Sequence, residues 1–273
     1  MAHHFHEPAT VEEAVRIKRE LFDSARFMAG GTEVNNRRAG DAPSHVIWLG
    51  RLGLGEILRR EGGVSIGATA TLQEILESGI VHPAIREAAR NHANRNIRNV
   101  ATIGGHLGVC RSCADLVPVL LSLRARLRVA GDMGETERSC ESWVFGERDG
   151  LVLSVEVPDP PQGSGVALDH YSRTANDLSI VTAAVSMRVE EGRARDVILA
   201  VGGVAATAIR LAHVEAALEG NALLPKGAIE ALVAAHVAPI DDIRGSAAFK
   251  RVIAGTLVER ASLVAWSRAQ EGR

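Results

Sequence analysis

Two long apolar segments near residue 190 restrict the folds that this chain can adopt. The stretch LSIVTAAVSMRVEEGRARDVILAVGG, residues 178–203, predicts two strands separated only by the polar residues EEGR. A crossover to a parallel neighbour needs a dozen or more residues, so this short connection joins an antiparallel hairpin. A purely parallel sheet is therefore excluded for this half of the chain.

Helix and strand signals alternate quickly in the first half. Thr10 and Glu13 form a capping-box pattern that predicts a helix over about 11–21, and Thr71 with Glu74 begins another helix in the same way. Strands are predicted in ARFM, HVIWL and GVSIGA. Helical periodicity returns in PAIREAARNHA and in DLVPVLLSLRA, which leads into a strand RLRVAG.

A change of composition predicts a domain boundary near residue 160, because Pro158, Pro160, Pro161 and Gly163 are typical of a linker. Beyond the hairpin, helices are expected near 211–219, 225–238 and 246–268, with Ser246 as the cap of the last. That helix is expected to bury one apolar stripe. The stripe consists of Val252, Ile253, Leu257, Val258 and Val264.

The composition narrows the function classes. Of 273 residues 46% are hydrophobic, and the net charge of -2 gives no attraction to nucleic acid or anionic membranes. No apolar run reaches the roughly 20 residues of a membrane-spanning helix, and the N-terminus lacks the apolar core of a signal peptide. Three cysteines leave one unpaired in any disulfide scheme, which suits a reducing compartment. We expect a cytoplasmic protein without a membrane span or a nucleic-acid partner.

Two paired-glycine turns are the main candidates for ligand binding. Gly30 and Gly31 follow the predicted strand ARFM, and Gly104 and Gly105 follow the extended segment NVATI. Glycine permits positive φ and close approach of the main chain, so successive N–H groups can surround a phosphate. Two such turns could hold a pyrophosphate from both sides, with hydroxyl groups nearby, and we expect valine in either turn to release the ligand without unfolding the chain. A glycine pair also simply ends many strands.

The standard single-segment motifs are missing. The segment GLGEIL has leucine where the third glycine of G-x-G-x-x-G belongs, and no G-x-x-x-x-G-K-[ST] occurs, so Rossmann and P-loop sites are disfavoured. No G-x-S-x-G frames a hydrolase triad.

Cys110, Cys113 and Cys140, together with His106, raise the alternative of a metal site. Their H-x₃-C-x₂-C spacing could serve zinc, whereas an iron–sulfur cluster normally requires four thiolates. Buried free cysteine behaves as a small hydrophobic residue, and we favour that interpretation.

Eight segments, in order, resemble the FAD-binding subunit of molybdenum hydroxylases. That family includes the flavin subunits of carbon monoxide dehydrogenase and bacterial xanthine dehydrogenase, and the resemblance spans nearly the whole chain. The segments are FHEPATVEEA, FMAGGTE, SIGATATLQEI, IRNVATIGGH, ADLVPVLLSLRA, LVLSVEVP, GGVAATAIRL followed by EAALEG, and DIRGSAAFKR.

The resemblance implies an α+β fold. Two small α/β subdomains, about 1–53 and 54–160, would form an FAD-binding domain of the vanillyl-alcohol-oxidase/PCMH type over residues 1–160. Residues 166–273 would form a C-terminal domain of the carbon monoxide dehydrogenase flavoprotein type, with an antiparallel sheet and helices.

The resemblance also implies which residues hold FAD. Residues 29–34 would wrap the phosphates, residues 102–106 would form a second wall, and Asp115 would bind the flavin nucleotide. His106 stands where the family usually has asparagine, Glu33 is expected to act mainly through its backbone, and Arg173 matches a basic residue near the start of the C-terminal domain. The cofactor set is Met28, Ala29, Gly30, Gly31, Thr32, Glu33, Val34, Thr102, Ile103, Gly104, Gly105, His106, Val109, Asp115 and Arg173. No catalytic side chain and no metal ligand are expected.

The function implied is that of an oxidoreductase subunit. Substrate would be oxidised at the molybdenum cofactor of a large subunit, electrons would pass through the [2Fe–2S] clusters of a small subunit, and FAD in this chain would hand them to a final acceptor such as NAD. Two alternatives stay open: an assembly or nucleotide-binding protein that has lost flavin, which the histidine at position 106 permits, and a self-contained flavin oxidoreductase.

Overall fold

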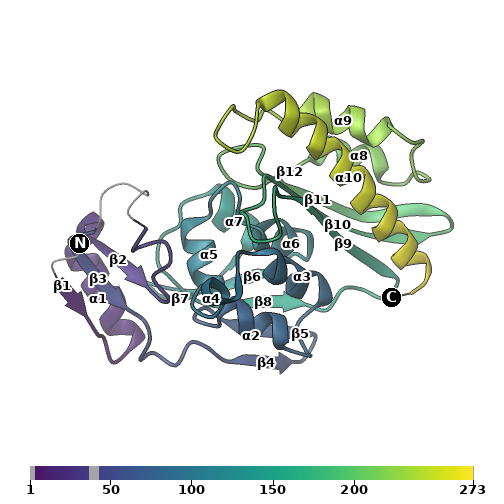
Figure 1. The fold of residues 1–273 in the computed structure, drawn as a ribbon. Coiled ribbons are helices and arrows are strands. Elements are labelled where there is room, and N and C mark those ends of the chain that lie inside the picture. Colours follow the sequence, from purple (N-terminus) through teal and green to yellow (C-terminus); the bar gives the residue numbers. More distant parts are fainter. Residues whose placement is uncertain (1–3, 37–42, 273) are drawn as a thin grey trace. The chain divides into compact units, whose positions relative to one another are not determined.

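The computed structural model describes residues 4–36 and 43–272, with the elements labelled as in Figure 1. The chain forms two compact units, each assembled from several stretches of sequence. The first unit contains Met1–Val81, Asn94–Val109 and Ala125–Val157, and the second contains His82–Ala93, Cys110–Arg124 and Pro158–Arg273. Among the described residues, no helix is both long enough and apolar enough to cross a bilayer.

A three-stranded parallel sheet begins the first unit. Its strands, in spatial order, are β1 (His4–His6), β3 (His45–Trp48) and β2 (Ala25–Met28). Helix α1 (Val11–Leu21) begins where the Thr10 hydroxyl accepts the N–H of Glu13, and it packs Ala14 into one apolar cluster with residues of β2 and β3. The predicted helix over 11–21 and the predicted strand ARFM are confirmed.

A five-stranded sheet completes the first unit. In spatial order it consists of β4 (Ile57–Arg60), β5 (Gly63–Gly67), β8 (Leu151–Pro158), β6 (Arg126–Gly131) and β7 (Gly134–Ser139). The helices of this unit, besides α1, are η1 (Phe22–Ser24), α2 (Leu72–Glu77), α4 (Arg95–Arg98), α5 (Ile103–Val109) and α7 (Cys140–Phe145). The capping box of Thr71 and Glu74 is present at the start of α2, as predicted.

The second glycine pair lies in a helix, and the expectation that it ends a strand is wrong. Before the glycine pair, Thr102 forms only an isolated antiparallel bridge with Thr71. Helix α5 then starts at Ile103 and contains both glycines. The Thr102 hydroxyl accepts the N–H of Gly105 in the manner of an N-cap, which favours a helix despite the low helix propensity of glycine.

A four-stranded antiparallel sheet forms the centre of the second unit. Its order is β12 (Ile209–Arg210), β11 (Arg193–Gly202), β10 (Val181–Glu190) and β9 (Ser164–Tyr171). The β10–β11 hairpin is confirmed. Glu191 and Gly192 both have positive φ, which gives the tight turn the twist of the strands that it joins.

Helices cover both faces of this sheet. They are α3 (Pro83–Asn91), α6 (Leu116–Ser122), α8 (Ala212–Leu218), α9 (Ala228–His236) and α10 (Ala247–Gln270). Ala183 and Val185 of β10 belong to the core beneath α10, whereas Thr182 and Ser186 donate hydrogen bonds to Asp115 and Ser122 at the two ends of α6. The two-residue period of the strand therefore assigns one face to α10 and the other to α6.

The long helix α10 starts at its predicted cap, where the Ser246 hydroxyl accepts the N–H of Phe249. The predicted stripe is partly wrong, because Val252 is 65% and Val264 is 43% exposed. The buried face consists instead of Ala254, Leu257, Val258, Ala261 and Ala265. Small residues are needed there because helix and sheet touch: a Cβ on Gly165 of β9 would lie 1.8 Å from the carbonyl oxygen of Ala265.

The N-cap of α3 predicts a pH dependence of stability. His82 Nδ1 accepts the N–H of Ala84 at 3.1 Å. Burial, and secondarily the nearby positive charge of Arg268, lowers the pKa of His82 from 6.5 to about 4, while the negative charge of Asp159 partly opposes this shift. Between pH 6.5 and 4, His82 is protonated in the unfolded chain but mostly neutral in the folded chain. The free energy of unfolding should therefore fall by about 3 kcal/mol as the pH drops from 6.5 to 4.

The variant His82→Asn keeps a cap and loses this titration. Urea unfolding at several pH values should therefore give a shallower loss of stability between pH 6.5 and 4 than in the wild type. Equal slopes for the two proteins would contradict the assignment.

Candidate functional site

The first glycine turn lies at the surface of the first unit, directly after β2. Gly31 has φ = 72°, in the left-handed region that favours glycine. In the part of the chain that the structure describes, the N–H groups of Gly30, Gly31 and Thr32 donate no hydrogen bond to the protein. The Glu33 carbonyl accepts the N–H of Asn36 at 2.9 Å, which closes the turn. Free amides beside a left-handed glycine form a concavity that suits an anion.

The second glycine segment packs directly against the first. A Cβ on Gly30 would lie only 1.6 Å from the carbonyl oxygen of Val100, so the two main chains are in contact. Within the first unit, the fold therefore brings Gly30 of the first turn next to Val100, two residues before Thr102.

The second segment cannot act as a second set of free amides, as the sequence suggested, because its N–H groups are used within the unit. Those of Ile103 and Gly104 donate to the carbonyls of Ala70 and Ala68, at 3.1 and 2.8 Å. Those of Gly105 and His106 donate to the hydroxyl and the carbonyl of Thr102. In this segment Gly105 is exposed, whereas Thr102 is 6% exposed and its hydroxyl accepts the N–H of Gly105.

Asp115 begins α6 in the second unit and is 1% exposed. Its carboxylate does not cap its own helix. One oxygen lies 3.0 Å from His92 Nδ1 at the end of α3, and the other accepts the hydroxyl of Thr182 on β10 at 3.2 Å. No sequence pattern predicts the contacts of Asp115 with His92 and Thr182, because these three residues come from separate segments that only the folded second unit brings together.

Two further residues of the predicted cofactor set are at the surface. Val109 ends α5 in the first unit and is 38% exposed. Arg173 is exposed in the loop between β9 and β10, in the second unit.

The three cysteines are all buried. Burial raises the pKa of the Cys113 thiol, which keeps it protonated and poorly suited to bind a metal. Over the described ranges, no three or more His, Cys, Asp or Glu side chains are grouped so that they could hold a metal ion.

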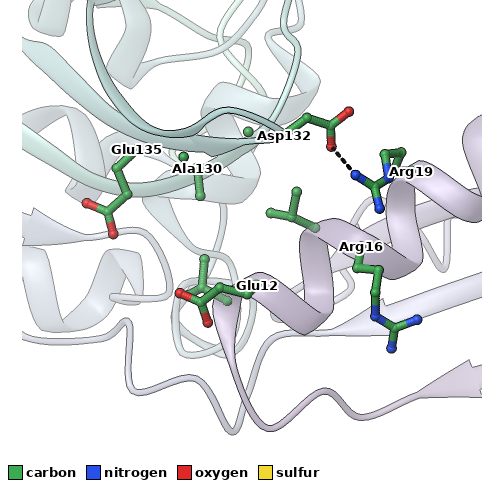
Figure 2. A pocket seen from close by; sticks show the side chains of 10 residues that line it. Glu12, Arg16, Arg19, Ala130, Asp132 and Glu135 are labelled. Atoms are coloured by element: carbon green, nitrogen blue, oxygen red, sulfur yellow. Dashed lines mark ion pairs between the residues drawn. The ribbon is translucent and has the colours of Figure 1, made fainter.

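A shallow hollow of about 310 Å³ lies between α1 and the β6–β7 hairpin of the first unit (Figure 2). Charged side chains of both signs surround it, among them Glu12, Arg16, Arg19, Asp132 and Glu135. Arg19 and Asp132 approach each other to 4.0 Å across it. None of the predicted cofactor residues lines this hollow, and its mixed charges favour no particular ligand.

Two known domain families match the chain. The family described as the FAD binding domain in molybdopterin dehydrogenase matches residues 1–160. The CO dehydrogenase flavoprotein C-terminal domain matches residues 167–265.

Individual proteins resemble the chain over almost its full length. The uncharacterized protein YgfM of Escherichia coli (strain K12) is 37% identical over 94% of each chain. The 6-hydroxypseudooxynicotine dehydrogenase complex subunit alpha of Paenarthrobacter nicotinovorans is 31% identical over 96% of this chain and 93% of its own. A chain in the structure of carbon monoxide dehydrogenase from Hydrogenophaga pseudoflava superimposes with a TM-score of 0.91, at 29% identity over 98% of both chains.

Proposed function

Because this chain belongs to the FAD-binding subunits of the molybdenum hydroxylases, we propose that it passes electrons from the iron–sulfur clusters of a partner chain to a final acceptor such as NAD. The observation that carries the proposal is the first glycine turn, whose N–H groups at residues 30–32 donate to no acceptor among the described residues, and in which Gly30 lies against Val100. FAD, when bound, supplies the redox chemistry, and the protein supplies binding, orientation and control of access.

We assign the phosphates of FAD to residues 29–34, where the left-handed Gly31 and the free amides provide donors without a side chain in the way. Thr102 and the exposed Gly105 would form the opposite wall. Asp115 and Arg173, both in the second unit, stay in the proposed set on the resemblance to the family alone.

We propose a large subunit with the molybdenum cofactor and a small [2Fe–2S] subunit as partners. The three cysteines of these 273 residues fall short of the four thiolates of a [2Fe–2S] cluster, which supports a separate cluster-bearing partner. The relative from Paenarthrobacter nicotinovorans is itself named as a subunit of a dehydrogenase complex. We place the assembly in the cytoplasm, where cysteines stay reduced.

The purified chain is expected to bind one FAD, with absorption bands near ~370 and ~450 nm that no side chain imitates. Anaerobic addition of the dithionite-reduced small subunit, freed from excess dithionite, should then bleach the band near ~450 nm, and NAD should restore it. A chain that takes up no FAD would favour the assembly-protein alternative. Turnover of a small molecule by the isolated chain, at about 1 to 10³ per second, would favour the self-contained enzyme.

A further inference from the structure

Trp143 holds the helix that contains the second glycine pair. The indole lies in α7 and is only 2% exposed, and its Nε1–H donates to the carbonyl oxygen of Leu107 at 3.0 Å. Leu107 is in the last turn of α5, where carbonyl groups have no partner within the helix. The indole therefore fixes the C-terminal end of α5 from a segment 36 residues away.

The other end of α5 is fixed independently. Ile103 and Gly104 donate to Ala70 and Ala68, in the segment between β5 and α2. Hydrogen bonds to neighbouring main chain thus hold residues 102–105. The position of the C-terminal part of α5 depends instead on the hydrogen bond at Leu107.

The indole is itself held in place. The guanidinium carbon of Arg138 lies 5.4 Å from the centroid of the Trp143 ring, and Arg138 Nη2 donates to the carbonyl of Glu147 at 2.9 Å, just beyond α7. At the start of α7, the Ser139 hydroxyl accepts the N–H of Ser142 at 2.9 Å. Because Arg138 lies over the ring and the Ser139 cap fixes the start of α7, the indole can define the position of its acceptor.

We propose that Trp143 is a positioning residue for FAD: its hydrogen bond to Leu107 holds the C-terminal part of α5, and with it His106 and Val109, two residues of the proposed cofactor set that lie beyond those held by Ala68 and Ala70. This inference rests on the proposed function. Groups that line a cofactor site must be held within about 0.5 Å of the productive geometry, and an unanchored C-terminal helix end would not hold His106 and Val109 so.

The test removes the indole N–H and keeps the ring. Two variants at position 143 lack the N–H donor: Trp143→Phe, and a protein with benzothienylalanine incorporated there. Benzothienylalanine keeps the shape of the indole, so it serves if phenylalanine disturbs folding. Trp266→Phe is the matched control, because Trp266 packs on the core of the second unit. For each protein, the Kd for FAD is measured by the quenching of flavin fluorescence, and the Tm is measured without FAD.

Loss of one hydrogen bond that orients the site should raise the Kd about three- to tenfold in both variants at position 143 and leave it unchanged in Trp266→Phe. A role in packing alone would lower the Tm without changing the Kd. Wild-type affinity in both variants would therefore overturn this inference and leave the proposed function intact. A wild-type chain that binds no FAD would overturn both.

Discussion

Gly104→Val is expected to destabilise the first unit itself, and not merely to release FAD. A Cβ on Gly104 would lie 2.6 Å from the carbonyl oxygen and 2.7 Å from the Cβ of Ala68. Neither atom can rotate away, and the N–H of Gly104 donates to that same carbonyl at 2.8 Å. The two main chains would have to separate, which should lower the free energy of unfolding by about 3 kcal/mol.

Urea unfolding of the FAD-free protein, followed by circular dichroism, measures this loss. Gly108→Ala is the control in the same helix, because a Cβ there meets no atom within 4 Å, and alanine should stabilise the helix by up to about 1 kcal/mol. A wild-type unfolding midpoint for Gly104→Val would contradict the close contact between α5 and Ala68.

Gly31→Val is expected to give the opposite result, with FAD lost and the fold retained. Its Cβ would meet Asn35 Nδ2 at 2.7 Å and Met28 Sδ at 3.1 Å, and both atoms end flexible side chains that can move aside. The left-handed backbone at φ = 72° disfavours valine by about 1–3 kcal/mol. The proposed phosphate donors would be displaced or covered, and losing one or two hydrogen bonds to a charged group should raise the Kd for FAD about a hundredfold.

Gly62→Val separates backbone strain from ligand contact. Gly62 has φ = 74° in the β4–β5 turn with no atom within 4 Å of an added Cβ, so it carries the same strain outside the proposed site. Equilibrium titration with FAD should give a wild-type Kd for Gly62→Val and a greatly raised one for Gly31→Val. Equal Kd values for the two variants would exclude the first turn as the phosphate site.

The sequence predicted those parts of the fold that depend on neighbouring residues. Thr10, Thr71 and Ser246 were recognised as helix caps because each hydroxyl bonds an amide three residues ahead. The β10–β11 hairpin was recognisable because its short turn stands between two apolar runs. The family, the fold class and FAD as cofactor followed from motifs in family order and are confirmed.

Features that depend on distant residues were not predicted. The helix α5 contradicts the propensity of its two glycines, and it is held by Ala68, Ala70 and Trp143, which no local pattern connects to it. The two exposed valines of α10 were assigned to its core because periodicity cannot show that the sheet requires alanines. The domain boundaries and the individual FAD ligands stay predictions.

The interleaving of the two units has a consequence for the way the chain is made. Helix α6 leaves the ribosome before β10 and β11, although all seven of its residues are buried in the unit that it forms with them. At a synthesis rate of about 5–20 residues per second, the apolar surface of α6 stays exposed for several seconds before β10 and β11 are made. A nascent chain interrupted near residue 160 would present that helix to chaperones and to other nascent chains, because α6 cannot be buried until β10 and β11 have been synthesised.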